Sequence, residues 1–225
     1  MDFKLEGKYL EIQEQARAFA RAVEPIAVEA DDMSQLHPGL LVALQESGLA
    51  ELMVPAEYGG RLDRLDPLAI CLVREILMGT SANADSLVAM QGIGSYALTA
   101  AGSPEQRKRW LPGVARAETL AALALTEPNA GSDLKSVTTE VEPVADGLLL
   151  RGEKSYISNA GAASFYEVFA REGSGYSMLL VPADSPGVSV TPTPELIAPH
   201  VLGEVSFDDV VLPESARLGQ SGKGL

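Results

Sequence analysis

The spacing of apolar residues changes once along the chain, near Glu118, and this change constrains the fold more than any other feature. Upstream of it, apolar residues recur at steps of three and four, as in Ile12, Ala16 and Phe19, which is the pattern of one helix face. Downstream, short β-branched or aromatic runs are separated by turn residues, as strands are. The sequence therefore predicts an α+β fold: an all-α bundle followed by a small antiparallel β-barrel or sandwich.

Start and stop signals divide the helical half into five expected helices. First-turn prolines, Asp or Ser caps and terminal glycines mark their ends. The expected helices are 9–30, kinked near Pro25; 38–48; 66–79; 86–101, loosened by Gly92 and Gly94; and one that opens on a capping box at 103–106.

Residues 68–78 are apolar nearly all round, so we expect this helix to be buried in the centre of the bundle. Cys71 lies within it and is the only cysteine of the chain, which rules out an intrachain disulfide. We expect Cys71 to be a small buried hydrophobic residue rather than a reactive thiol.

In the second half, turn residues separate short runs that we expect to be strands. The expected strands are 137–141, 148–156, 165–170, 176–181, 201–207 and 210–211. The expected division of the chain is a helical domain at 1–118, a middle β domain at 119–214 and a flexible tail at 215–225.

The 225 residues include 31 Asp and Glu against 17 Lys and Arg, so the formal net charge is −14. An acidic surface repels phosphate backbones and anionic lipids, which argues against nucleic acid and membranes as the main partners. An anionic ligand would need a local basic patch or helix N-termini. The N-terminus has no apolar signal-peptide core and no stretch reaches transmembrane length, so we expect a cytoplasmic protein.

One stretch that could bind a ligand runs from Leu123 to Asp133, where an expected strand leads into a loop with two hydroxyl side chains. Such a loop can present hydroxyls and backbone N–H groups to a planar polar ligand or a phosphate. The alternative is a plain corner, in which Gly131 has a positive φ and Ser132-Asp133 forms an Asx-type turn. The residues of this stretch favour the plain corner when they are considered alone.

The second stretch is 152–161, in which Tyr156 and Ser158 alternate along an expected strand and so face one side. An aromatic ring beside a hydroxyl could flank a flat heterocycle. A Tyr that packs across the sheet beside a solvated Ser is an equal alternative.

Taken in order, the helical half, LTEPNAGSD at 125–133, EKSYISNAG at 153–161 and FDDVVLPESARLG at 207–219 resemble the acyl-CoA dehydrogenase family. The family forms are T-E-P-x-A-G-S-D and K-x-W-I-T-N-G. Softer similarities lie in VPAEYGG at 54–60 and GSPEQRKRWLP at 102–112, so the resemblance covers essentially the whole chain.

The resemblance implies FAD as cofactor and α,β-desaturation of an acyl thioester as reaction. Tyr156 takes the place of the family's tryptophan on the flavin ring, and Ser158 that of its threonine. Ser132 matches a position that contacts both cofactor and substrate. The residues matching flavin-contact positions are Leu123, Leu125, Thr126, Gly131, Ser132, Tyr156, Ile157 and Ser158.

Two departures from the family pattern bear on function. The segment 195–203 has no arginine where the family has a G-x-R element, which puts ordinary fatty acyl-CoA specificity in doubt. His200 in that segment could be a ligand-facing base, but a structural hydrogen bond is the favoured role. The sequence also stops before the family's C-terminal four-helix bundle, which carries the catalytic Glu, contacts to the ADP end of FAD and much of the oligomer interface.

Three hypotheses follow. The preferred one is a subunit of a split or heteromeric acyl-CoA dehydrogenase, whose bundle and base lie on a second polypeptide in a higher oligomer. The second is a structural or regulatory homologue that binds FAD weakly or not at all. The third is an enzyme of altered chemistry, acting on an unusual acyl-CoA or acyl-carrier thioester with a base drawn from within the chain.

Overall fold

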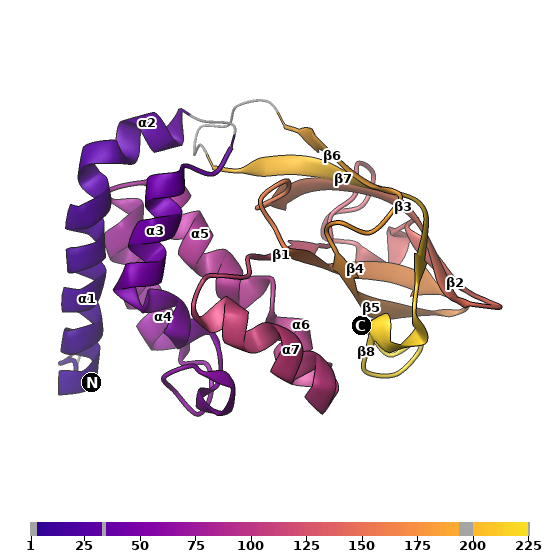
Figure 1. The fold of residues 1–225 in the computed structure, drawn as a ribbon, viewed down its shortest axis with the longest axis horizontal. Helices are drawn as coiled ribbons and strands as arrows, with labels where there is room; N and C mark the ends of the chain where they lie inside the picture. Colours follow the sequence, from indigo (N-terminus) through magenta and orange to yellow (C-terminus); the bar gives the residue numbers. More distant parts are fainter. Residues whose placement is uncertain (1–3, 33–34, 194–199, 225) are drawn as a thin grey trace.

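The computed structural model describes residues 4–32, 35–193 and 200–224, and it confirms a helical first half followed by a β-sheet half (Figure 1). The helices lie together on one side of the molecule and the sheet on the other. The α-helices are α1 (Gly7–Val23), α2 (Ala27–Asp31), α3 (Pro38–Ser47), α4 (Pro67–Met78), α5 (Ala82–Ile93), α6 (Tyr96–Ala101) and α7 (Pro104–Ala115).

Local capping signals set most helix ends where the sequence predicts them. Gly48 ends α3 with φ +66°, a left-handed conformation that glycine adopts readily. Asp66 accepts hydrogen bonds from the backbone N–H groups of Leu68 and Ala69 and so caps α4. The capping box of Ser103 and Gln106 opens α7. The expected kink is a 3₁₀ turn, Glu24–Ile26, that contains Pro25 and separates α1 from α2.

The single helix expected at 86–101 is wrong, because α5 ends at Ile93 and α6 begins at Tyr96. A Cβ added at Gly94 would lie 2.6 Å from the backbone N of Ala122, closer than any side chain tolerates. Glycine therefore allows the end of α5 to approach the first strand of the sheet.

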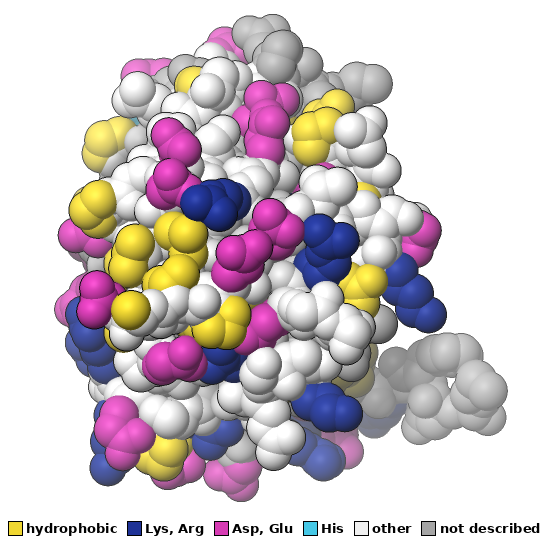
Figure 2. All heavy atoms as spheres, turned by 90° about the vertical axis from the view of Figure 1, so that its right-hand side faces the viewer, with side chains coloured by type: hydrophobic (Ala, Val, Ile, Leu, Met, Phe, Trp, Pro, Cys, Tyr) yellow, Lys and Arg dark blue, Asp and Glu magenta, His cyan; other side chains and the backbone are white. Residues whose placement is uncertain are grey.

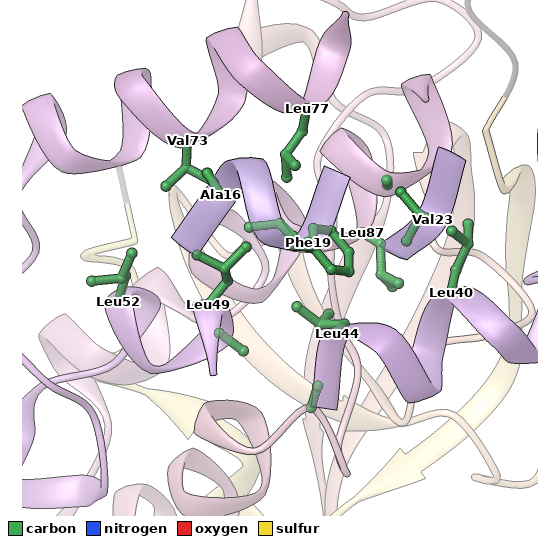
Figure 3. Packing of buried hydrophobic residues seen from close by; sticks show 14 of the residues in the cluster. Ala16, Phe19, Val23, Leu40, Leu44, Leu49, Leu52, Val73, Leu77 and Leu87 are labelled. Carbon is green, nitrogen blue, oxygen red and sulfur yellow. The ribbon is translucent and has the colours of Figure 1, made fainter. Parts of the chain in front are cut away.

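The core of the helical half forms around Phe19 of α1, which is surrounded in Figure 3 by leucines of other helices. Helix α4 contributes one face to this core, including Val73 and Leu77. Its other face is open to solvent, with Leu68 and Met78 about half exposed. The expected burial of this helix on all sides is therefore wrong.

Cys71 lies on the open face of α4 and is exposed, so the expectation of a buried cysteine is also wrong. The composition of the helix is apolar nearly all round, but only one of its faces meets α1 and α5 in the described structure. Composition alone cannot show which neighbours a helix has.

The β half is one sheet with the order β6-β7-β3-β2-β4-β5-β8, and β1 pairs with β4 outside this path. Its pairs are antiparallel except β1–β4 and β2–β4, so the sheet is mixed rather than purely antiparallel. The strands are β1 (Ala121–Ala124), β2 (Glu140–Val144), β3 (Gly147–Ser158), β4 (Phe165–Glu172), β5 (Gly175–Pro182), β6 (Val188–Pro192), β7 (Leu202–Leu212) and β8 (Arg217–Leu218).

Three details of the sheet differ from expectation. Strand β6 was not expected, because it starts directly after a Pro-Gly turn and is only half-buried. The runs at 201–207 and 210–211 are parts of one strand, β7. Residues 137–139 precede β2 instead of belonging to it.

Residues 214–224 are anchored to the sheet, so the expected flexible tail does not hold for them. Strand β8 pairs with β5, and Arg217 forms a 2.7 Å ion pair with the buried Glu172 of β4. Gly222 donates its N–H to Ser177 Oγ, and Gly224 donates to the carbonyl of Tyr176. Gly224 lies closely against β5, because a Cβ there would clash with the Ser177 backbone, whereas Gly219 and Gly222 have positive φ values.

Buried polar side chains join the two halves. Gln91 of α5 donates to the carbonyls of Val114 and Thr119 and accepts from Ala121 N–H. Asn83, at the start of α5, donates to the Ala30 carbonyl at 2.7 Å and accepts from Val201 N–H at 3.2 Å.

A buried carboxyl and an apolar cluster add to this interface. Glu167 of β4 accepts hydrogen bonds from the N–H groups of Ala97 and Leu98 in the first turn of α6. The rings of Trp110 and Phe165 pack beside this contact at a centroid distance of 5.1 Å. In the part of the chain that the structure describes, no helix is both long and apolar enough to cross a bilayer.

Candidate functional site

The two stretches singled out in the sequence lie against each other at the end of β1. The chain continues from Ala124 into Leu125 and Thr126, which run beside β3. Ser155 donates its backbone N–H to the Thr126 carbonyl at 2.9 Å, and Lys154 Nζ donates to the Leu125 carbonyl at 3.1 Å. The structure therefore brings together both predicted parts of the site.

Glu127 holds the loop in place from beneath. Its carboxylate accepts hydrogen bonds from the N–H and hydroxyl of Thr138, the N–H of Thr139 and the Lys154 ammonium. Burial alone would raise the pKa of Glu127, but these hydrogen bonds lower it to about 2. The carboxylate is thus charged and fully engaged, as expected for a residue with a backbone-bonding role.

The tip of the loop, 128–133, is mostly exposed. Gly131 does not have a positive φ, and a Cβ added there would meet nothing within 4 Å. The plain-corner explanation of Gly131 by positive φ is therefore wrong. Asp133 does form the expected Asx-type turn, because its side chain accepts the N–H of Lys135 at 3.2 Å. Because Gly131 has no side chain, there is open space beside the exposed Ser132, where a ligand could approach the backbone.

Tyr156 lies at a bulge of β3. The pairing of β3 with β7 shifts between Lys154 and Ile157, so strict alternation does not carry from Tyr156 to Ser158. Tyr156 has φ +57°, and its side chain is 62% exposed. The suggested cross-strand packing of Tyr156 is therefore wrong. A bulky residue held in the left-handed region is a feature that clusters at functional sites.

The other predicted residues differ in how far they reach solvent. Ser158 is partly exposed, and its Oγ lies 3.1 Å from Nε2 of His200. A hydrogen bond was the favoured role of His200, and this distance confirms one. Ile157 has its side chain in the core of the sheet, and its carbonyl accepts the N–H of Ala160. Leu123 and Leu125 are half-buried. The segment 195–199, with its missing arginine, lies outside the described residues.

Two residues of the second motif have roles that the sequence analysis missed. Lys154 is fully buried and bonds to the loop at 125–127. The available signal was its place in β3, an even number of residues after the buried Leu148 and Leu150, where alternation points a side chain inwards. Asn159 has φ +64°, and its buried amide donates to the Ala121 carbonyl at 3.1 Å. A lone Asn directly after a strand was the available signal.

Family models match most of the chain. Residues 8–118 match the model "Acyl-CoA dehydrogenase, N-terminal domain", and residues 122–210 match "Acyl-CoA dehydrogenase, middle domain". The chain belongs to the acyl-CoA dehydrogenase family. The sequence-based assignment of the family is thereby confirmed.

Curated relatives carry related names. The chain is 32% identical to the "Probable acyl-CoA dehydrogenase FadE25" of Mycobacterium tuberculosis, over 99% of this chain and 59% of that protein. It is 30% identical to the cyclohexane-1-carbonyl-CoA dehydrogenase of Geobacter metallireducens, over 95% of this chain and 58% of the relative. The chain thus spans about three fifths of the length of these relatives.

Solved structures share the fold. A glutaryl-coenzyme A dehydrogenase in complex with glutaryl-CoA has a TM-score of 0.91 and 28% identity, covering 100% of this chain and 59% of that one. An acyl-CoA dehydrogenase from Bacillus anthracis complexed with FAD has a TM-score of 0.86 and 29% identity, covering 98% and 38%. That such neighbours are FAD complexes supports FAD as the cofactor. The roles of individual residues remain predictions.

Proposed function

We propose that this chain forms the flavin cradle of an acyl-CoA dehydrogenase that desaturates an acyl thioester, with the catalytic base supplied from outside residues 1–225. The observation that carries the proposal is the junction of the loop at 125–133 with the bulge of β3, locked by Lys154 and Glu127. This junction joins the two stretches in which the sequence resembles the flavin-contact motifs of the family.

The residues at this junction fit a flat polar ring. The exposed ring of Tyr156 offers a stacking surface, and the β-bulge with φ +57° places that ring at the junction. Thr126 and Ser158 are both partly exposed, and each carries a hydroxyl, a group that has one proton to donate. Open space at Gly131 lets a ligand come close to the backbone beside Ser132. These features support binding of FAD by this chain.

Bound FAD would supply the acceptor for the hydride that leaves the β-carbon of the thioester. The chain's own part is to hold the ring and to orient hydroxyls towards it. Removal of the α-proton needs a positioned base, worth roughly 10²–10⁴ in rate. Glu127 is buried and engaged by four hydrogen bonds, which prevents it from serving as that base.

Glu167 is the second buried carboxyl that merits consideration, since burial raises its pKa to about 8 while backbone N–H bonds from Leu98 and Ala97 oppose that rise. Such a pKa would suit a general base. Both of its oxygens, however, accept N–H groups of α6, and the side chain has no exposed surface. These two carboxyls therefore do not supply the base, and we propose that a second polypeptide does.

A partner could cover the open face of the helical half. We define the α4–α5 surface as Leu68, Cys71 and Met78 of α4, Ile93 of α5 and Tyr96, the first residue of α6, all of which are exposed. A mainly apolar groove of about 180 Å³ adjoins Ile93 and Tyr96, and Ile70 and Gly92 also line it. Exposed apolar patches mark contact surfaces, so we assign this surface to the partner that carries the helical bundle.

The phosphates of a CoA thioester would have to bind against the overall negative charge. On the β end of the molecule, acidic, basic and hydrophobic side chains are intermixed (Figure 2). Several cations of the sheet already pair with carboxylates, as Arg151 does with Asp209 and Arg171 with Glu140. We therefore propose that the partner binds the CoA phosphates, or binds the carrier protein if the substrate is an acyl-carrier thioester.

The decisive experiment is anaerobic bleaching of the flavin by a panel of acyl thioesters. We expect no bleaching by the chain alone reconstituted with FAD, and rapid bleaching once the partner is present. Replacing the partner's catalytic Glu with Gln should abolish the reaction, while a lysine-to-arginine change on the partner's exposed surface serves as control. Rapid bleaching by the chain alone would place the base within it and reject this proposal.

A further inference from the structure

The hydroxyl of Ser158 can donate a hydrogen bond to the flavin only if its single proton is free to point there. A serine hydroxyl has one proton to donate and an oxygen that can accept. Ser158 Oγ lies 3.1 Å from His200 Nε2, so the imidazole decides how that proton is used. If Nε2 accepts, the proton of Ser158 is consumed by the histidine. If Nε2–H donates, the proton stays available for another acceptor.

The backbone beside His200 is held by buried amides. Val201, the next residue, donates its N–H to Asn83 Oδ1 at 3.2 Å and accepts the N–H of Asn159 at 2.9 Å. Both asparagines are buried, at 2% and 3% exposure. Asn83 belongs to the helical half and Asn159 directly follows Ser158. The position of His200 is therefore fixed by both halves of the chain, which is more than a surface loop residue requires.

The pairing of β3 and β7 adds to this arrangement. Ser158 lies opposite Leu202 in the ladder, two residues beyond His200. The hydroxyl and the imidazole thus approach each other at the point where both strands end. Neither side chain is buried completely, so a ligand at the junction could reach the hydroxyl.

We propose that His200 is a positioning residue, which donates Nε2–H to Ser158 Oγ and thereby directs the Ser158 proton to an acceptor on the flavin. This inference rests on the proposed function, because it requires FAD to bind at the junction. His200 acts through Ser158 and contacts no reacting atom in this scheme.

The test is a double-mutant cycle on FAD affinity, measured on the purified complex that contains this chain. His200→Leu should weaken FAD binding by about five- to tenfold, the effect of one lost hydrogen bond, and should shift the visible flavin spectrum. In a Ser158→Ala background, the same change should weaken binding by less than about twofold, because its target is gone. His200→Gln, whose side-chain amide can also donate, should restore most of the affinity and the spectrum.

His37→Asn is the matched control, since it replaces the other histidine at the cap of α3 by another capping residue and should leave FAD affinity unchanged. A readout without flavin is the ¹⁵N signal of His200 Nε2, which should show a protonated nitrogen and should move in Ser158→Ala. Equal effects of His200→Leu in both backgrounds, or an unprotonated Nε2, would overturn the inference alone. Failure of the unmodified complex to bind FAD would overturn the proposed function as well.

Discussion

Lys154 Nζ lies 2.9 Å from Glu127 Oε1, and neither side chain has more than 2% of its surface exposed. The pair joins β3 to the loop at 125–133, which are separate motifs in the sequence. Burial lowers the pKa of Lys154, and its carboxylate partner opposes that effect. Because Glu127 stays ionised through its other hydrogen bonds, the pair is best described as charged.

Removing one member of this pair should destabilise the fold strongly. We expect Lys154→Met to lower the free energy of unfolding by about 3–5 kcal/mol, because an uncompensated buried carboxylate remains. The double change Glu127→Gln with Lys154→Met should cost less than the sum of the single changes. Urea unfolding followed by circular dichroism measures these values. Arg151→Met breaks an exposed pair with Asp209 and should cost less than about 1 kcal/mol.

Low pH should remove the contribution of Glu127 to the stability of the fold. Its pKa in the folded chain is about 2, below the ordinary value of 4.5, so its stabilisation is complete above pH 4.5 and is lost as the pH falls towards 2. We therefore expect the midpoint of urea unfolding to fall over this interval. The midpoint of the Glu127→Gln variant should fall less steeply. An identical slope for both proteins would contradict the assignment.

Glu167 should have the opposite dependence on pH. Burial raises its pKa to about 8, so the folded chain binds more protons than the unfolded chain between pH 4.5 and 8. The free energy of unfolding should thus decrease as the pH rises through this interval. Glu167→Gln should flatten that decrease, whereas Glu153→Gln, at an exposed position of β3, should not.

The hydroxyls of the proposed cradle should set the flavin content. We expect the double change Thr126→Val and Ser158→Ala to yield a largely colourless complex, because each lost hydrogen bond to a buried polar ring costs about 1–3 kcal/mol. The ratio of flavin absorbance to protein absorbance measures this. Thr138→Val alters a threonine beneath the loop and keeps the backbone bond to Glu127, so it is the control. Full flavin occupancy in the double variant would reject both residues as flavin contacts.

The change Tyr156→Gly should weaken FAD binding with little effect on the stability of the fold. Glycine relieves the left-handed strain at φ +57°, and the exposed ring loses little packing, so the stability should stay within about 1 kcal/mol. FAD affinity should nevertheless fall by about tenfold or more, because the stacking surface is gone. Asp209→Gly, at φ +51°, relieves similar strain away from the cradle and should keep FAD affinity. Unchanged affinity in Tyr156→Gly would show that the ring does not stack on flavin.

Cys71 offers a direct probe of the α4–α5 surface. Because the thiol is exposed, one equivalent of a thiol reagent should react with the folded chain without denaturant. Addition of the proposed partner should slow this reaction by about tenfold or more if the partner covers α4. Cys71→Ser should not react. A thiol that reacts only in denaturant would contradict its exposure, and one that stays reactive in the complex would exclude this face as the contact.

The sequence predicts what depends on neighbouring residues along the chain. The Asp66 cap and the box at Ser103 begin helices through local hydrogen bonds, and Gly48 ends a helix through its left-handed backbone; all three are confirmed. The two motifs at 125–133 and 153–161 are similarly local, which is why the family can be assigned from the sequence alone.

What the sequence does not predict depends on contacts between distant segments. The break at Gly94 follows from the approach of Ala122, and the open face of α4 follows from the neighbours that the described chain provides. The bulge at Tyr156 arises where β3 meets both β7 and the loop at 125–127, so alternation within β3 cannot reveal it. The ion pair of Lys154 with Glu127 joins two separate motifs, so it can be recognised only once the positions of both in the fold are known.

The amide of Asn83 also has a consequence for synthesis. It is bonded to Ala30 and to Val201, and the latter lies 118 residues further along the chain. At about 5–20 residues per second, a ribosome needs roughly 6–24 s to add those residues. During that time the Asn83 side chain lacks one of its two partners, and the start of α5 lacks one of its ties to the β half. A nascent chain of this protein should therefore complete this part of the junction between its halves only after the start of β7 has emerged.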